Sequence, residues 1–177
     1  FLGDASNGGH WGDVTDAKLS TVGITSADVN DAVDPIVGAI TMADANVDGG
    51  CSVQVPVDAV VTDNCQLAAS DVTLDASIVG GNALVDDANI TITQTDARTV
   101  TVGGYLVVSD LESCPAQVHV DINADDVCAN TAATVSADVN VYDVDIPVIG
   151  AVTMDDAVVD SACSVDVPVS ATITDNC

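Results

Sequence analysis

The chain has almost no positive charge and almost no aromatic side chains. Lys18 and Arg98 stand against 28 acidic residues, and the formal net charge is −26. Such a chain has nothing that could neutralise phosphates, so a nucleic acid partner is excluded and anionic membrane surfaces are disfavoured. Aromatic residues make up 2% of the chain. The core therefore has to be built from Val, Ile, Leu and Ala, and we expect each domain to need further fastening.

Glutamate, long apolar runs and catalytic motifs are also scarce. Glu112 is the only Glu, and Asp favours turns and caps where Glu favours helices, so the composition argues against helices. No run of 18 apolar residues exists, so we expect no membrane span. No Ser or Cys nucleophile is arranged with a His in a recognisable motif, and Gly-rich phosphate loops are missing. We therefore do not expect an enzyme.

The C-terminal end of the chain repeats an earlier part of it. Residues 35–65 and 147–177 align at a constant offset of 112, with 20 of 31 positions identical. A period of this size predicts tandem domains rather than a solenoid of short units. The second copy stops at Cys177, where the first continues through strand-like segments. We therefore expect either a longer array or completion by another copy of the chain.

We divide the chain into four segments. Residues 1–34 are predicted as a lead-in arm or linker, 35–122 as a first β-sandwich unit, 123–146 as a connection, and 147–177 as the start of a second, truncated unit. The sequence SADVN at 26–30 recurs at 136–140, upstream of the second copy, which supports a lead-in. His10 and Trp11 are either an aromatic plug for a neighbouring subunit or a local contact of the arm.

Alternation of apolar and polar residues predicts strands. It is clearest in residues 53–58, 90–93, 99–102 and 117–122, with Gly- and Asp-rich turns between the apolar segments. Short strands at this spacing are typical of a sandwich. The predicted fold class is all-β, with tandem immunoglobulin-like β-sandwich units of which the second is incomplete.

Six cysteines form three pairs with one spacing. The pairs are Cys51 and Cys65, Cys114 and Cys128, and Cys163 and Cys177, each 14 positions apart. Zinc sites need clustered short spacings, so the pattern favours disulfides made in an oxidising compartment. Two connectivities stay open: local bonds within each pair, which we prefer, and bonds across strands of neighbouring half-units.

Several of these motifs resemble the hyalin-repeat (HYR) type of immunoglobulin-like domain. They are the Cys-led strand at 51–55, the T-D-N-C corner at 62–65, the segment GYLVVSD at 104–110 and the closing strand that begins at Cys114. The residues Leu111, Glu112 and Ser113 depart from the usual Gly-Asn before the closing Cys. The resemblance implies extracellular, repeated, adhesive domains without catalytic residues.

Two runs of oxygen-bearing side chains are candidate calcium ligands. They are Asp44, Asn46 and Asp48, followed by Gly49, and Asp121, Asn123 and Asp125. Alternating oxygen ligands can wrap a hard cation. An EF-hand is excluded because Val55 stands where its twelfth-position Glu would be. The alternative explanation of the acids is a general solubility or high-salt adaptation. Asn89 opens the only N-glycosylation sequon.

These observations predict an extracellular or cell-surface structural protein. The first hypothesis is a subunit of a filament or surface assembly whose disulfide-stapled units join head to tail, with copies of the chain as partners. The alternative is a segment of a long cell-surface adhesin that binds glycans or a surface.

If calcium is bound, its removal lowers stability. We expect EGTA at low ionic strength to lower the melting temperature, because ion binding and relief of self-repulsion among the carboxylates both stabilise the folded chain. The measurement is a thermal melt with and without chelator, and Mg²⁺ addition is the control for charge screening. An unchanged melt would remove calcium from the account.

Overall fold

The computed structural model describes residues 31–159, 161 and 163–177. The expected arm lies largely outside the described residues, including His10, Trp11 and the sequence SADVN at 26–30. The compact unit that concerns us runs from Val33 to Cys177. Within the described part of the chain, no helix is long and apolar enough to cross a membrane.

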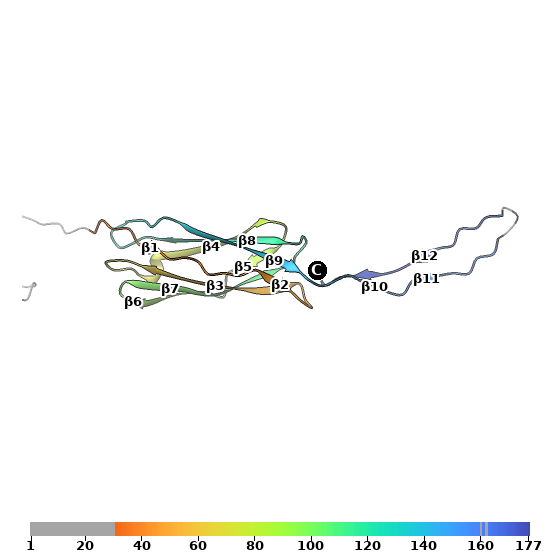
Figure 1. Cartoon of the computed structure of the whole chain (residues 1–177), viewed down its shortest axis with the longest axis horizontal. Helices are drawn as coiled ribbons and strands as arrows, with labels where there is room; N and C mark the ends of the chain where they lie inside the picture. The colour runs from red at the N-terminus through yellow and green to blue at the C-terminus, as the bar shows by residue number, and fades with distance from the viewer. Residues whose placement is uncertain (1–30, 160, 162) are drawn as a thin grey trace, which may run out of the picture. The chain divides into compact units, whose positions relative to one another are not determined.

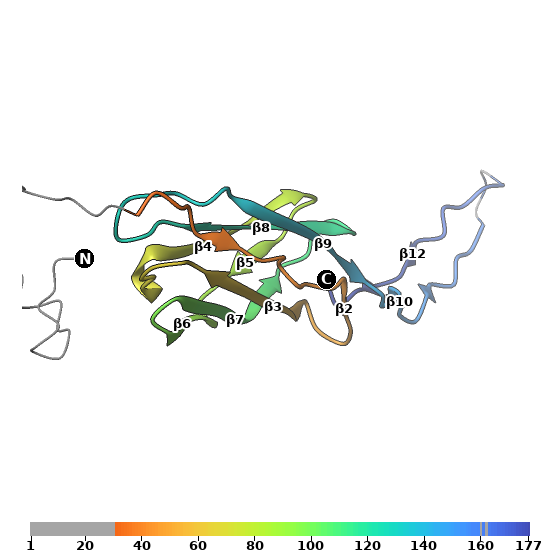
Figure 2. The ribbon, with the colours of Figure 1, turned by 60° about the vertical axis from the view of Figure 1, so that its left-hand side comes forward.

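Two sheets pack face to face in the first unit (Figure 1, Figure 2). One has the strand order β1-β3-β7-β5, with β6 also paired to β7, and the other has the order β2-β9-β8-β4. The strands are β1 (Ile36–Val37), β2 (Ala45–Val47), β3 (Ser52–Thr62), β4 (Val72–Gly80), β5 (Leu84–Asp86), β6 (Ile90–Asp96), β7 (Thr99–Ser109), β8 (Ala116–Ala124) and β9 (Val135–Asp143). A 3-10 turn, Ala69–Asp71, precedes β4.

The strand order is that of an immunoglobulin-like sandwich. The N-terminal segment contributes β1 to the first sheet and β2 to the second, where β2 runs parallel to β9 with Ala45 opposite Val141. The other neighbours in both sheets pair antiparallel. The N-terminal segment is shared between two sheets, and the later strands follow the orders β3-β7-β6 in one sheet and β9-β8-β4 in the other. This arrangement matches that of an immunoglobulin domain. The predicted all-β sandwich is confirmed.

The core between the sheets is aliphatic. Every second residue of β3, β7 and β8 points inward, as the period-two pattern of the sequence requires. Among the described residues, the buried side chains are Val, Leu, Ile and Ala, together with Pro35 and Asp126. The buried residues of the central strands are Val55, Val57, Ala59, Val61, Val100, Val102, Leu106, Val108, Ala116, Val118, Val120, Ile122 and Ala124.

The first unit extends further than the sequence analysis predicted. The expected connection 123–146 contains β9, which pairs along β8 from Ala116–Val141 to Ile122–Val135. Val139 and Val141 of β9 are buried in the core. The predicted end of the unit at residue 122 is therefore wrong. Without β9, the edge of β8 and one side of the core would be open to water.

Gly104 marks the point where β7 changes neighbours. Its first half pairs with β6 as far as Gly104, and its last residues pair with β5. Gly104 has φ +127°, and a Cβ there would lie 2.2 Å from the backbone oxygen of Asn89. Glycine therefore allows the turn before β6 to approach the middle of β7. Asn89 itself is exposed, and its glycosylation stays a prediction.

The repeated segment 147–177 forms a hairpin with the register of the first unit. Its strands are β10 (Val148–Ile149), β11 (Thr153–Met154), β12 (Val169–Ser170) and β13 (Ile173–Thr174). Val148 pairs with Thr174 and Ile149 with Ile173, which are the pairs Ile36–Thr62 and Val37–Val61 shifted by one period. The bond from Gly38 N–H to the Val60 oxygen, 2.8 Å, likewise recurs between Gly150 and Thr172 at 2.7 Å.

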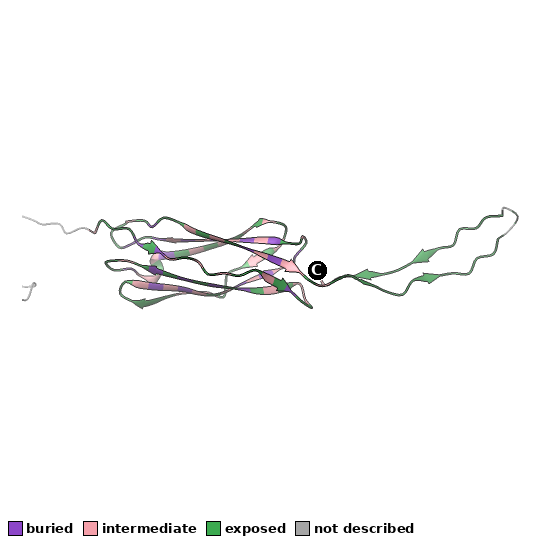
Figure 3. Cartoon of the chain, viewed as in Figure 1, coloured by how far each residue is buried: buried purple, intermediate pink, exposed green. Residues whose placement is uncertain are grey.

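The hairpin repeats the first strands of the sandwich unit without a core around them. Val55, Val57 and Val61 are 0%, 2% and 0% exposed, whereas their counterparts Val167, Val169 and Ile173 are 46%, 60% and 66% exposed. Figure 3 shows the same contrast between buried positions in the first unit and exposed positions along the hairpin. The segment therefore repeats the strand register of the first unit while its apolar residues stay exposed.

The repeat supplies a matched pair of core substitutions. We expect Val55→Ala to lower the free energy of unfolding by about 2 kcal/mol, because it removes two buried methyl groups and leaves a cavity. Val167→Ala, the same change one period later, should cost less than about 0.5 kcal/mol because the side chain is half exposed. Urea unfolding followed by circular dichroism measures both. Equal losses would show that the hairpin is buried in solution.

Candidate functional site: the junction between repeat units

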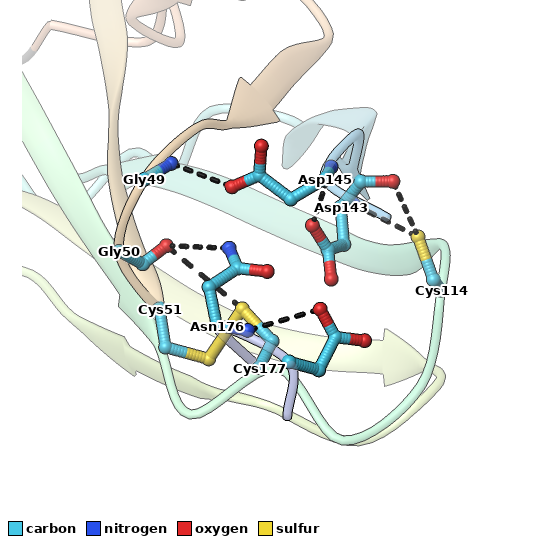
Figure 4. The surroundings of a disulfide bond; sticks show 9 residues. Gly49, Gly50, Cys51, Cys114, Asp143, Asp145, Asn176 and Cys177 are labelled. Atoms are coloured by element: carbon cyan, nitrogen blue, oxygen red, sulfur yellow. Dashed lines mark hydrogen bonds between the residues drawn. A yellow bond between two sulfur atoms is a disulfide. The ribbon is translucent and has the colours of Figure 1, made fainter. Parts of the chain in front are cut away.

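A disulfide joins the end of the second repeat to the first unit. Cys51, which precedes β3, is bonded to Cys177, 126 positions later, with the two Cα atoms 5.0 Å apart. Cys177 is the repeat counterpart of Cys65, so the T-D-N-C corner of one unit is fastened to the preceding unit (Figure 4). We call this end of the sandwich the junction pole and define it by Cys51, Cys114, Asp143 and Asp145.

The local pairing preferred from the sequence is wrong for Cys51 and Cys177, because these two bond to each other. The physical reason is the length of the strand between Cys51 and Cys65. β3 has 11 residues and spans about 36 Å when extended, whereas bonded cysteines have Cα atoms within about 7 Å. The nine residues of β8 separate Cys114 from Cys128 by about 30 Å in the same way.

Polar contacts surround the disulfide at the junction pole. The Asn176 side chain donates from Nδ2 to the Gly50 oxygen at 3.3 Å, and the Gly49 N–H donates to Asp145 Oδ2 at 2.6 Å. Asp143 Oδ1 accepts the N–H of Asp145 at 3.0 Å. The bond from Asn176 holds the end of the chain against the turn before β3, the bond from Gly49 joins that turn to Asp145, and the third bond lies within residues 143–145 (Figure 4). Carboxylates that accept backbone N–H groups make strong hydrogen bonds, so Asp145 fixes the loop that receives the corner.

Cys114 lies at the same end of the sandwich as this disulfide (Figure 4). The Asp143 N–H donates to its Sγ at 2.9 Å, and the thiol is exposed. A pocket lined by Leu111, Glu112, Ser113, Cys114, Asp143, Asp175 and Cys177 joins it to the docked corner. The junction pole therefore places a second cysteine in the lining of the pocket that also contains the bonded Cys177.

The opposite end of the sandwich, the corner pole, carries the other two cysteine positions of the unit. We define it by Asp63, Cys65, Asp126 and Cys128. Asp63 Oδ2 accepts the Cys65 N–H at 3.2 Å, and Asp126 Oδ1 accepts the Cys128 N–H at 2.8 Å. Each aspartate thus makes a turn that presents a cysteine two residues later. Carboxylate oxygens of the two aspartates lie within 4.8 Å of each other, so the turns are neighbours.

Asp126 is the buried carboxylate of the corner pole. It also accepts from the Asn130 N–H at 2.8 Å and from Asn130 Nδ2 at 2.7 Å. Hydrogen bonds of this kind offset the cost of removing a charge from water. Sequence analysis missed Asp126, although the shared spacing of two residues from aspartate to cysteine in D-N-C and D-V-C was the signal that would have found it.

The structure places the predicted calcium ligands along strands rather than in loops. Asp44, Asn46 and Asp48 lie in and beside extended β2, and Asp44 Oδ1 accepts the Asn140 N–H at 2.7 Å. Residues four apart on a strand are separated by about 13 Å, whereas ligands of one calcium ion lie within about 5 Å of each other. One ion cannot take all three residues in this geometry.

The second triplet has the same arrangement. Asp121 and Asn123 belong to β8, and Asp125 follows it. Asp121 accepts from the Ser136 hydroxyl at 2.5 Å, and Asn123 accepts from the Thr134 hydroxyl at 2.5 Å. These side chains tie β8 to β9 and its approach. The expected chelating loops are therefore not formed, and calcium binding by the chain stays a prediction.

His119 lies on the outer face of β8 between two carboxylates. Its Nδ1 is 2.6 Å from Asp138 Oδ1 and its Nε2 is 3.1 Å from Asp121 Oδ1. The hydrogen bond to Asp138 is the largest cause that raises the pKa of His119 above 6.5. Desolvation, the next largest, lowers this pKa, and the charges of Asp121 and Asp138 raise it further. The pair of carboxylates therefore favours the imidazolium form.

Comparisons with known proteins add little to this geometry. No family model and no curated protein matches the chain. Among solved structures, the chain is similar to the crystal structure of a mutant SrpA adhesin from Streptococcus sanguinis, with 16% identity and a TM-score of 0.37. The match covers 65% of this chain and 61% of that chain, less than two thirds of its length. The fold and the disulfide define the class of this chain as an immunoglobulin-like β-sandwich followed by a hairpin that repeats its first strands and is bonded to it through Cys51 and Cys177.

Removal of the junction disulfide should lower stability and release the hairpin. The bond closes a loop of about 127 residues, and loop entropy gives an upper value of about 5 kcal/mol for its contribution. We expect Cys51→Ser to lose a large part of this in urea unfolding and to make residues 147–177 sensitive to protease. Cys163→Ser, the same change one period later at an exposed thiol, is the matched control. Equal losses of stability and equal protease sensitivity in the two variants would contradict the bond between Cys51 and Cys177.

The carboxylates around His119 predict a pH dependence. Because its pKa is raised in the folded state, the ion pairs contribute stability that is complete below pH 6.5 and is lost as pH rises through the folded pKa. We expect an NMR titration of the ring protons to give a pKa above 6.5, and Asp138→Asn to lower it. A pKa at or below 6.5 in the unmodified chain would contradict the contact.

Proposed function

We propose that this chain is part of an extracellular structural array in which immunoglobulin-like units join head to tail through disulfides to form a filament or a surface assembly. The observation that carries the proposal is the bond between Cys51 and Cys177. It fastens the first corner of one repeat unit to the far end of the preceding unit. A contact between two different ends of one kind of unit is heterologous, and repeating it without closure produces a linear chain.

The hairpin supports the same function. It keeps the strand register of the first unit, and its apolar side chains are exposed where the first unit buries them. Exposed apolar residues in this pattern favour burial against further strands. In such an array, each unit is followed in one direction by a copy of the same unit.

Composition is consistent with a structural role outside the cell. Disulfides persist in oxidising compartments, and a net charge of −26 keeps neighbouring chains apart by repulsion. The resemblance to hyalin-repeat domains supports an extracellular repeat, and no catalytic arrangement emerged from the sequence. Because the units repel each other electrostatically, a covalent bond is a suitable way to hold successive units together.

Electron microscopy of the natural protein tests the proposal. We expect linear strings with a repeat of about 40 Å, since the longest strand of a unit spans about 36 Å. A reductant should make the strings bend more freely, because it opens the junction bonds, while EGTA tests calcium separately. Compact particles without a linear repeat would contradict the array. Strings that end in a distinct globular tip and bind glycans would favour the adhesin alternative.

A further inference from the structure

We propose that each junction between units holds a second disulfide, formed by Cys114 and the cysteine of the following unit that corresponds to Cys128. The inference rests on the proposed head-to-tail array and specifies how its units are fastened. Its partner is a copy of the same repeat unit, presented through the corner pole. The surface involved is continuous with the bonded contact of Cys51 and Cys177.

The cysteine positions of a unit divide equally between its two ends. Cys51 and Cys114 lie at the junction pole, where the Asp110 N–H donates to the Cys51 oxygen at 3.1 Å and Cys114 contacts Asp143. Cys65 and Cys128 lie at the corner pole, beyond the far ends of β3 and β8. Two units stacked end to end therefore bring four cysteine positions to one junction.

One half of that junction is visible in the structure. Asp175 and Cys177 are the sequence counterparts of Asp63 and Cys65, although Asp175 Oδ1 here accepts the N–H of Asn176, at 2.9 Å, and not that of Cys177. Asp175 and Cys177 line the pocket that also contains Cys114. The corner of the second unit is thus already seated beside the Cys114 thiol.

The other turn of the corner pole would follow the first one. Within the first unit, carboxylate oxygens of Asp63 and Asp126 lie within 4.8 Å of each other, and each turn presents its cysteine two residues after the aspartate. In a completed second unit, the counterpart of Asp126 therefore lies beside Asp175. Its cysteine, the counterpart of Cys128, is then delivered to the pocket that holds Cys114.

Other partners for Cys114 fit less well. Cys128 of the same unit is at the far end of β8, about 30 Å away, and Cys51 is already bonded. Cys163 is the counterpart of Cys51 and so belongs to the next junction pole. The remaining candidate partner of Cys114 is the cysteine of the following unit that corresponds to Cys128.

Formation of the bond requires a two-electron oxidant, for which we name a disulfide such as oxidised glutathione. The Cys114 thiolate attacks the glutathione disulfide and releases one glutathione thiolate, giving a mixed disulfide. The thiolate of the Cys128 counterpart then attacks the Cys114 sulfur and releases the second glutathione. Two protein thiols are oxidised to one disulfide, and one oxidised glutathione is reduced to two thiols.

The test compares the full chain with the same chain lengthened after Cys177 by a second copy of its residues 66–143. Both are equilibrated with oxidised and reduced glutathione, treated with iodoacetamide and digested with an Asp-specific protease. We expect Cys114 to be alkylated in the 177-residue chain and to lose this labelling in the lengthened chain. Peptide 110–120 should then be linked to the peptide of the appended residues that correspond to 126–137.

Two serine variants of the lengthened chain act as matched controls. Replacing the appended counterpart of Cys128 with serine should restore alkylation of Cys114. Cys128→Ser in the first unit should leave Cys114 protected from alkylation, since Cys128 of that unit lies at the corner pole, opposite the junction pole. Alkylation of Cys114 in the lengthened chain while Cys51 stays bonded overturns the second disulfide and leaves the array intact. Alkylation of both Cys51 and Cys114 overturns the junction and the proposed array together.

Folding of the appended residues is checked by amide NMR. If they do not fold, the same digest is made on the natural protein, isolated without reductant and with its thiols blocked. A link between peptide 110–120 and a peptide of the 126–137 type supports the proposal, because the length of β8 prevents that bond within one folded unit. A blocked, unlinked Cys114 in the natural protein overturns it.

Discussion

The length of an extended strand governs how this chain is held together. β3 places Cys51 and Cys65 at opposite ends of the sandwich, and β8 does the same for Cys114 and Cys128. Strands of this length separate their flanking residues by about 30 Å or more, far beyond the reach of a disulfide. The cysteines therefore face outward from the two poles, and Cys51 finds its partner in the next repeat. The equal spacing of 14 residues suggested disulfides within each pair. In the structure, the same spacing places the two cysteines of a pair at opposite ends of one strand.

The aliphatic core explains why the strands have this length and regularity. Long runs of alternating Val and small polar residues favour extended strands with one buried face, and β3, β7 and β8 carry most of the buried side chains. A core of Val and Ala buries less surface per residue than an aromatic one. The bond between Cys51 and Cys177 lies at one end of the sandwich, so it fastens the hairpin without entering the packed core.

The sequence was enough to predict the sandwich but not its end or its bonds. Period-two alternation located β3, β7 and β8, because half-buried strands impose that pattern. β9 was missed because its alternation is mixed with Asp and Asn, and because the recurrence of SADVN at 136–140 was taken as a lead-in to the second copy. The predicted disulfide pairing was wrong because a sequence spacing does not show the path of the chain between two cysteines. Fourteen residues that form one strand separate the cysteines, whereas fourteen residues that form a hairpin would bring them together. The two aspartate runs likewise lie along strands, and calcium binding by their residues stays a prediction.

The bond between Cys51 and Cys177 is the central claim, and a digest of the oxidised chain with an Asp-specific protease tests it most directly. Mass spectrometry without reduction should find peptide 48–57, which contains Cys51, linked to peptide 175–177, which contains Cys177. A link from peptide 48–57 to peptide 63–70, which contains Cys65, would contradict the account, because it would require β3 to be folded back on itself.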